Sequence, residues 1–188
     1  MTVESQMTVK EIREMEQRLR EPFPAHDIQW MPQTFGGSAD KPWVMVLAYV
    51  DARALQERLD EVFSFAGWKD SYIVHDKGII CNLSVRIGGV WVAKENGAPE
   101  THVEAFKGGI SSAFKRVCAS GFGIGRYLYN LDTTYANCQP EKPSGSRGQL
   151  KTDGWNRAWT ALRKGGDKME IWWRTPQLPE WALPGGSQ

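Results

Sequence analysis

The run from Ala105 to Leu131 combines basic side chains with small residues at a regular spacing. Lys107, Ser111 and Lys115 recur every four residues, so a helix would place them in one stripe on its surface. Arg116 lies beside that stripe. The run holds four basic residues and no acidic one, whereas a solvated helix usually mixes its charges. A surface of one sign with small neighbours can bind a flat anion, and a nucleic-acid backbone is the commonest such partner. The plain alternative is an ordinary solvated face.

The end of this run, GFGIGRYLY, alternates glycines before an arginine and two tyrosines. Gly121, Gly123 and Gly125 can expose backbone N–H groups to an anion, although glycines also simply end helices. Arg126 with the following tyrosines offers charge for phosphate and rings for bases. Alternatively, Tyr127–Tyr129 packs on the core. The glycines follow a helix, which is the wrong order for a dinucleotide fingerprint, and the sequence has no GxxxxGK[ST] motif.

These motifs and two blocks upstream resemble the signature of the Rad fifty-two superfamily of single-strand annealing proteins. The blocks are Leu19–Pro24 with Ile28–Trp30, then Leu47–Arg53 with Leu59–Phe63 and Gly67-Trp68, then Ser111–Arg116 with Phe122–Tyr129. They keep the family's order, and the similarity is closest to the bacterial DNA-damage-response A branch and to related phage recombination proteins. The last third of the chain lies outside the resemblance.

The resemblance implies which side chains would contact DNA. Lys115 and Arg116 match an adjacent basic pair that lines the inner groove for single-stranded DNA in relatives. Lys107 matches a basic position earlier on the same helix. Tyr49 matches a groove tyrosine, with a plain core role as its alternative, and Arg53 matches a basic residue one turn later. The candidate DNA-binding residues are therefore Lys107, Ser111, Lys115, Arg116, Arg126, Tyr49 and Arg53.

The chain departs from the family pattern at two places. Some relatives carry a further basic residue just after the basic pair, where this chain has Ala119-Ser120, and Arg126 is the candidate substitute. Relatives also often carry an arginine or lysine before the first core strand, where this chain has only Gln29 and Gln33. We therefore expect fewer phosphate contacts than in those relatives.

The elements that position these residues predict an α+β fold. An amphipathic helix carrying Val9 and Leu19 should end before Pro22, and residues 28–42 read as a loop rich in Pro and Gly. Trp43–Val50 is predicted as a strand buried on both faces, and Asp51 as the N-cap of the next helix. Three strands follow, at Trp68–His75, Ile79–Ile87 and Val90–Lys94, joined by turns at Asp76–Gly78 and Gly88-Gly89.

The cationic helix comes next, with Phe106, Ile110, Ala113, Phe114 and Val117 on its buried face. The expected architecture is an antiparallel three- to four-stranded β-meander packed against a long helix, which is a β-β-β-α core. An N-terminal helix and a Trp-rich C-terminal extension complete it. The same order is what the resemblance implies for the core fold.

The expected domain organisation is a DNA-binding and oligomerisation core at 1–139, a linker at 140–150 and a Trp-rich extension at 151–188. The extension carries five of the nine tryptophans, too many aromatic residues for a disordered segment. Asp153 is predicted to cap a helix bearing Trp155, Trp159 and Leu162, and Met169–Arg174 is predicted as a strand. The extension either packs on the core or a neighbouring subunit, or serves as an arm for partners or bases.

Composition indicates a compact protein with a local nucleic-acid surface. The 188 residues are 41% hydrophobic and carry a net charge of +1, so no global basic field exists. Three cysteines and three histidines lack zinc-site spacing, and we expect no metal or other cofactor. Cys81, Cys118 and Cys138 are predicted as buried or idle thiols. No apolar run reaches membrane length and the start has no signal region, so a cytoplasmic protein without a membrane partner is expected.

The sequence thus predicts a non-enzymatic protein that binds and anneals single-stranded DNA in recombination and repair, as a homo-oligomeric ring or filament. A recombinase or a single-strand binding protein is a further candidate partner. One alternative is a structural oligomerisation module with this fold, which would not bind an oligonucleotide at low salt. The other is a small metal-dependent nucleic-acid enzyme, which would nick plasmid DNA. No paired carboxylates or Ser/His/Asp arrangement points to catalysis.

Overall fold

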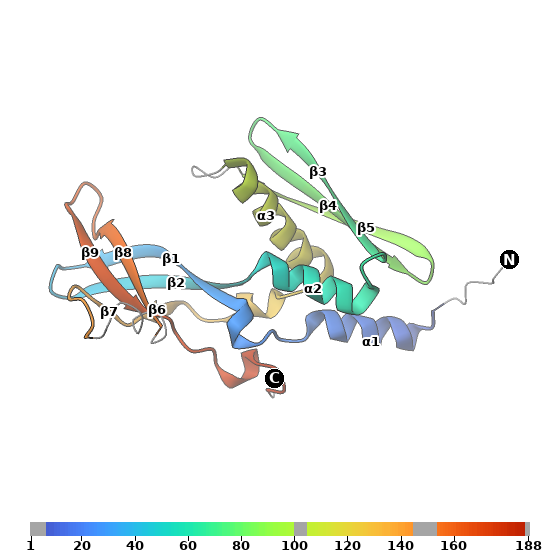
Figure 1. The fold of residues 1–188 in the computed structure, drawn as a ribbon, viewed down its shortest axis with the longest axis horizontal. Coiled ribbons are helices and arrows are strands. Elements are labelled where there is room, and N and C mark those ends of the chain that lie inside the picture. The colour runs from blue at the N-terminus through green and yellow to red at the C-terminus, as the bar shows by residue number, and fades with distance from the viewer. Residues whose placement is uncertain (1–6, 100–104, 145–153, 187–188) are drawn as a thin grey trace. The chain divides into compact units, whose positions relative to one another are not determined.

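The structure, a computed structural model, describes residues 7–99, 105–144 and 154–186 of the chain (Figure 1). The backbone packs as two compact units. Unit 1 contains Met1–Asp27, Val50–Asn130 and Trp181–Gln188. Unit 2 contains Ile28–Tyr49 and Leu131–Glu180. The predicted division into a core, a linker and an extension stays a prediction, and residues 145–150 of the linker lie outside the described residues.

Unit 1 begins with two capped helices. In α1 (Val9–Arg20), Thr8 and Glu11 form a capping box, and Leu19 is buried. In α2 (Ala52–Phe63), the Asp51 carboxylate accepts a 2.9 Å hydrogen bond from the backbone N–H of Arg53. Both predicted helices and the predicted N-cap are confirmed. The caps satisfy N–H groups that have no partner inside the helix.

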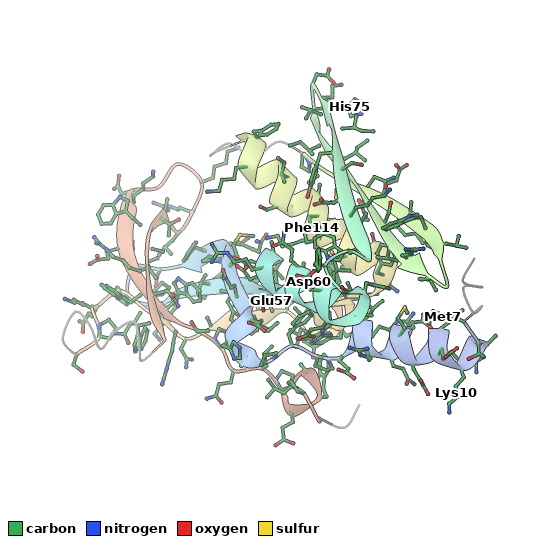
Figure 2. All side chains as sticks on the ribbon, turned by 45° about the vertical axis from the view of Figure 1, so that its right-hand side comes forward. Met7, Lys10, Glu57, Asp60, His75 and Phe114 are labelled. Carbon is green, nitrogen blue, oxygen red and sulfur yellow. The ribbon has the colours of Figure 1, made fainter. Side chains whose placement is uncertain are left out.

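The β-meander of unit 1 consists of β3 (Trp68–His75), β4 (Gly78–Ile87) and β5 (Val90–Pro99), in the order β3-β4-β5. Both pairings are antiparallel, as predicted, and β5 is five residues longer than the predicted strand because all of it pairs with β4. The turn between β4 and β5 uses two glycines with φ of 55° and 81°, where other residues would be strained. His75 lies at the far tip of the β3–β4 hairpin (Figure 2).

The predicted long helix is α3 (Ala105–Val117), which packs against β4 and β5 (Figure 1). Alternate residues of β4 face it and are buried, as expected for a half-covered strand. Gly109 allows close contact, because a Cβ there would lie 2.9 Å from the Cδ1 atom of Ile79. The Phe114 ring contacts the Trp68 ring at a centroid distance of 6.2 Å. Phe106 was predicted to be buried, and this is wrong: it is 60% exposed, in the first turn of the helix.

Unit 2 contains two three-stranded sheets. The first has the order β1-β2-β6, with β1 (Ile28–Gly37), β2 (Pro42–Val50) and β6 (Thr134–Ala136). The prediction of a loop over residues 28–42 is wrong for most of that range, because β1 pairs with β2 despite its proline and glycines. The prediction that β2 is buried on both faces is also wrong. Val44 and Val46 are buried, whereas Trp43 and Leu47 are 40% and 49% exposed.

The second sheet of unit 2 has the order β7-β9-β8, with β7 (Cys138–Gln139), β9 (Lys168–Arg174) and β8 (Trp155–Ala161). The strand predicted at Met169–Arg174 is confirmed. The helix predicted around Trp155 and Trp159 is wrong, because these residues form β8, paired along its length with β9. Asp153, its predicted cap, lies outside the described residues. The core of unit 2 contains Val44, Val46, Ala136 and Trp173, with Ala158 packed against it.

Candidate nucleic-acid interface

The basic stripe of α3 forms as its spacing predicts. Lys107 is exposed, and Ser111 and Lys115 are half-buried. Residues four apart lie on the same side of an α-helix, and Arg116, which is exposed, is rotated by about 100° from Lys115. The helix is fixed from the opposite side by the meander. Lys115 and Arg116 therefore point from two neighbouring faces of the same fixed helix.

Lys115 lies in a mixed electrostatic environment. Burial lowers the pKa of its ammonium group, and the negative charge of Asp51 opposes that shift. Asp51 also caps α2, and Arg53 is exposed in the first turn of that helix. The N-terminus of α2 thus lies within electrostatic reach of the stripe. Sequence reasoning identified Asp51 as a cap and missed its effect on Lys115, since no local pattern links the two residues.

The C-terminal turn of α3 is held by Arg126. After Val117 the chain continues as a π-helical turn, Cys118–Phe122, and reverses at Gly123, whose φ is 80°. The Arg126 guanidinium donates from Nε to the carbonyl of Ala119 at 2.7 Å and from Nη2 to that of Ser120 at 2.6 Å. The resemblance places a further basic residue of some relatives at this point of the chain. Arg126 satisfies helix-end carbonyls, and its role as a substitute for that residue stays a prediction.

Ser120 connects this turn to the meander, a contact that sequence reasoning missed. The Asn96 amide in β5 donates to the Ser120 hydroxyl at 2.7 Å, and that hydroxyl donates to the Arg116 carbonyl at 2.8 Å. The backbone that carries Arg116 is thereby tied to the adjacent sheet. A serine near a helix end with an asparagine in a neighbouring strand is too common a pairing to identify from sequence.

The alternating glycines allow close packing. A Cβ at Gly123 would lie 3.1 Å from the Cγ atom of Arg20, and one at Gly125 would lie 2.8 Å from the Val50 side chain. Both glycines have positive φ. Close approach and chain reversal therefore account for these glycines without a bound anion. Of the tyrosines that follow, Tyr127 is a core residue whose hydroxyl accepts a 2.9 Å hydrogen bond from the Phe23 N–H, while Tyr129 is 75% exposed.

Tyr49 is the one candidate residue in unit 2. It is half-buried in β2, and its hydroxyl donates to the Gln29 side-chain oxygen at 3.0 Å. It shares its side of the strand with Trp43 and Leu47, because alternate residues face the same way. All other candidates lie in unit 1. Their assignment to DNA, like that of Tyr49, stays a prediction.

The described residues show no metal-binding cluster, and their buried thiols are poorly suited to react. Within residues 7–99, 105–144 and 154–186, no three His, Cys, Asp or Glu side chains are grouped so that they could hold a metal ion. Of the three thiols, Cys81 and Cys118 are buried and Cys138 is half-buried. Burial raises the pKa of Cys81 to about 11 and raises the pKa of Cys118 as well, which disfavours the reactive thiolate. No helix in the described part of the chain is long and apolar enough to span a membrane.

Comparison with known proteins accounts for most of the chain. Residues 11–146, which include every candidate residue, match the family model described as Rad52/22 family double-strand break repair protein. A single-stranded DNA-binding protein DdrA from Deinococcus radiodurans is 34% identical over 175 residues, which is 92% of this chain and 69% of that protein. A protein of the same name from Deinococcus deserti is 33% identical over 175 residues, covering 92% and 72% of the two chains.

Proposed function

The chain belongs to the Rad52/22 family of double-strand break repair proteins, and on that premise we propose that it binds and anneals single-stranded DNA in repair. The observation that carries the proposal is the basic surface of α3, a helix with no acidic residue of its own, formed by Lys107, Lys115 and Arg116 beside small residues. Both relatives carry the name single-stranded DNA-binding protein, which supports the same substrate.

The arrangement suits a protein that holds a strand by its phosphates. Lysine and arginine contact phosphate oxygens without reading sequence, so base edges stay available for pairing. The small side chain of Ser111 leaves room along the stripe for a backbone that follows the helix. Annealing needs no bond chemistry, because phosphate neutralisation and a search for the matching register are sufficient. The proposed protein is therefore not an enzyme and uses no cofactor.

The proposed protein acts as a homo-oligomer, as a ring or filament that lays out a continuous path for the strand. Among the described residues, no further strand pairs with the outer edges of β3 and β5 in the meander, and open edges favour contacts with another chain. Val74 on β3 and Phe106 on α3 are 54% and 60% exposed. A neighbouring subunit would cover both features, and a head-to-tail contact that closes gives a ring.

The function is tested by mixing two complementary labelled oligonucleotides with the protein in EDTA and without ATP. Pairing should be faster with protein than without, and high salt should abolish the difference because phosphate contacts are salt-sensitive. Both strands should be recovered intact. A strict requirement for ATP or a divalent ion, or cleavage of the strands, would contradict the proposal and favour a nucleic-acid enzyme.

Assembly is tested separately by light scattering at micromolar concentration. We expect a mass many times the 21.2 kDa of one chain. A clean monomer with and without DNA would contradict the ring. An oligomer that binds no oligonucleotide at low salt would instead identify a structural oligomerisation module. A cytoplasmic location and a recombinase or single-strand binding protein as partner complete the proposal.

A further inference from the structure

Basic residues from separate elements of unit 1 converge on the C-terminal turn of α3. Arg116 belongs to α3 itself, and Arg126 follows the turn and bonds to its carbonyls. Arg20, the last residue of α1, and Lys94, in β5, reach the same turn from two further elements. Nothing in the local sequence around Arg20 or Lys94 places either residue beside α3.

The glycines of the turn create this convergence. A Cβ at Gly121 would lie 2.8 Å from the Cβ atom of Lys94, and one at Gly123 would lie 3.1 Å from the Cγ and Nε atoms of Arg20. The aliphatic stems of both basic residues therefore pack on bare backbone. Both residues are exposed, and the Arg20 side chain keeps 55% of its surface accessible. The charged ends thus remain at the surface of the turn.

Stabilising the end of the helix does not account for all of this charge. Cations favour a helix C-terminus, but Arg126 already donates to the carbonyls of Ala119 and Ser120. The Arg20 guanidinium pairs with Glu16, one turn earlier in α1. That carboxylate is 49% exposed, so the ion pair lies in water, where such pairs contribute little and exchange easily.

We propose that Arg20 and Lys94 form, with Arg116 and Arg126, a second phosphate-binding surface that continues the basic stripe past the end of α3. Its ligand is the phosphodiester backbone of the same single strand, so the inference rests on the proposed function. Arg116 adjoins Lys115 in the helix, which makes the two surfaces continuous. In the free protein the Arg20 guanidinium pairs with the Glu16 carboxylate, and when the strand binds a phosphate oxygen takes the place of that carboxylate.

The first test compares two double variants that each remove two positive charges. Arg20→Gln with Lys94→Gln removes charge from the turn and keeps most of each aliphatic stem. The matched control, Lys10→Gln with Lys77→Gln, alters the far end of α1, where Figure 2 shows Lys10, and the turn between β3 and β4. Lys10 also pairs with a carboxylate one turn away, Glu14, at 3.7 Å.

The measurement is the affinity for a thymidine oligonucleotide as a function of salt. Each lost phosphate contact lowers the log–log slope by about 0.7 for single strands, so the first variant should lose about 1.4. At about 50 mM salt its affinity should fall roughly tenfold or more, and the control should behave as wild type. An unchanged melting temperature shows that the variant folds.

A second test expects an increase in DNA affinity, which a purely structural role of Arg20 would not produce. Glu16→Gln releases Arg20 from its ion pair and should tighten binding severalfold at low salt. Glu14→Gln makes the same charge change on the same helix, releases Lys10 instead, and should have a smaller effect. The proposal of a second surface is wrong if Arg20→Gln with Lys94→Gln binds the oligonucleotide as tightly as the control. It is also wrong if Glu16→Gln and Glu14→Gln change the affinity equally. Failure of the wild-type protein to bind the oligonucleotide would instead contradict the proposed function.

Discussion

The two compact units present different chemistry at their surfaces. Unit 1 gathers positive charge on α3 and at its C-terminal turn, and holds it with caps and hydrogen bonds to the neighbouring elements. Unit 2 exposes the rings of Trp43, which is 40% exposed, and of Tyr135 and Trp159, each 62% exposed, and its exposed cations Lys168 and Arg174 lie at the two ends of β9. Charge of one sign suits phosphates, whereas rings suit bases or another protein surface. We therefore propose that unit 1 supplies the affinity for a DNA backbone.

One arginine from each unit shows two different uses of this side chain. Arg58 of unit 1 is buried, donates to the carbonyls of Arg18 and Glu21 at 2.9 Å each, and lies 4.2 Å from the centre of the Phe23 ring. It thereby fixes the end of α1 to α2. Arg157 of unit 2 pairs with Glu170 across β8 and β9, and its side chain is 64% exposed. One arginine is part of the scaffold and the other lies on the surface.

The largest predicted effect follows from this difference. Arg58→Ala leaves two carbonyls without their donor and removes the ring contact, so it should lower the free energy of unfolding by about 3 kcal/mol. Arg157→Ala, the matched control, should cost less than about 1 kcal/mol because exposed ion pairs contribute little. Urea unfolding of both variants measures the difference. Equal losses would contradict the distinction between a scaffold arginine and a surface arginine.

The next prediction concerns pH. Burial lowers the pKa of Lys115, and only its protonated form attracts phosphate. DNA affinity should therefore be complete below that pKa and fall severalfold as the pH rises through it, before an ordinary lysine would titrate. Lys115→Arg keeps its charge and should hold its affinity across that range. As a control, Lys168→Arg in unit 2 should leave the dependence of DNA affinity on pH as it is in the wild type. If Lys115→Arg also shows the wild-type pH dependence, Lys115 does not contact the phosphates.

A smaller effect is expected at Arg126. Arg126→Ala removes two hydrogen bonds to the carbonyls of Ala119 and Ser120, and should lower the free energy of unfolding by about 1 kcal/mol because the site is exposed. Arg126→Lys should restore part of the DNA affinity but less of the stability, since lysine lacks the planar fork. Oligonucleotide binding and thermal unfolding separate the two roles. Full affinity in Arg126→Ala would leave only the structural role.

The smallest effect is expected in unit 2. Tyr49→Phe removes the hydrogen bond to Gln29 and keeps the ring, so DNA affinity should change by less than about twofold if the phosphates bind to unit 1. Gln29→Ala breaks the same hydrogen bond and leaves the hydroxyl in place, which makes it the control. A loss of tenfold or more in Tyr49→Phe alone would mean that its hydroxyl contacts DNA and that unit 2 shares the site.

The units also differ in how far sequence predicts their structure. The elements of unit 1 have local signals: Asp51 caps α2, two glycines turn between β4 and β5, and apolar residues alternate along β4. In unit 2, β1 contains a proline and two glycines, which indicate a loop. It forms a strand because it lies at the edge of its sheet, where proline is tolerated, and packs Trp30 and Phe35 against the core of unit 2.

The helix prediction for the tryptophans of β8 was wrong for a different reason. Trp155 and Trp159 are four residues apart, a spacing that fits both a helical face and alternation along a strand. Pairing with β9 decides the outcome, and local sequence does not encode it. The candidate site likewise depends in part on contacts that local sequence does not encode. The stripe on α3 follows from periodicity, whereas the effect of Asp51 on Lys115 and the approach of Arg20 and Lys94 to the turn depend on long-range packing.

The central claim is that phosphates bind to α3, and the salt dependence of oligonucleotide binding tests it most directly. Lys115→Ala with Arg116→Ala should lower the log–log slope by about 1.4 and weaken binding to all sequences alike. Lys168→Ala with Arg174→Ala removes the same two charges from exposed positions of β9 in unit 2 and should keep the wild-type slope. A folded α3 variant with the wild-type slope, or an equal loss in the β9 variant, would contradict the account.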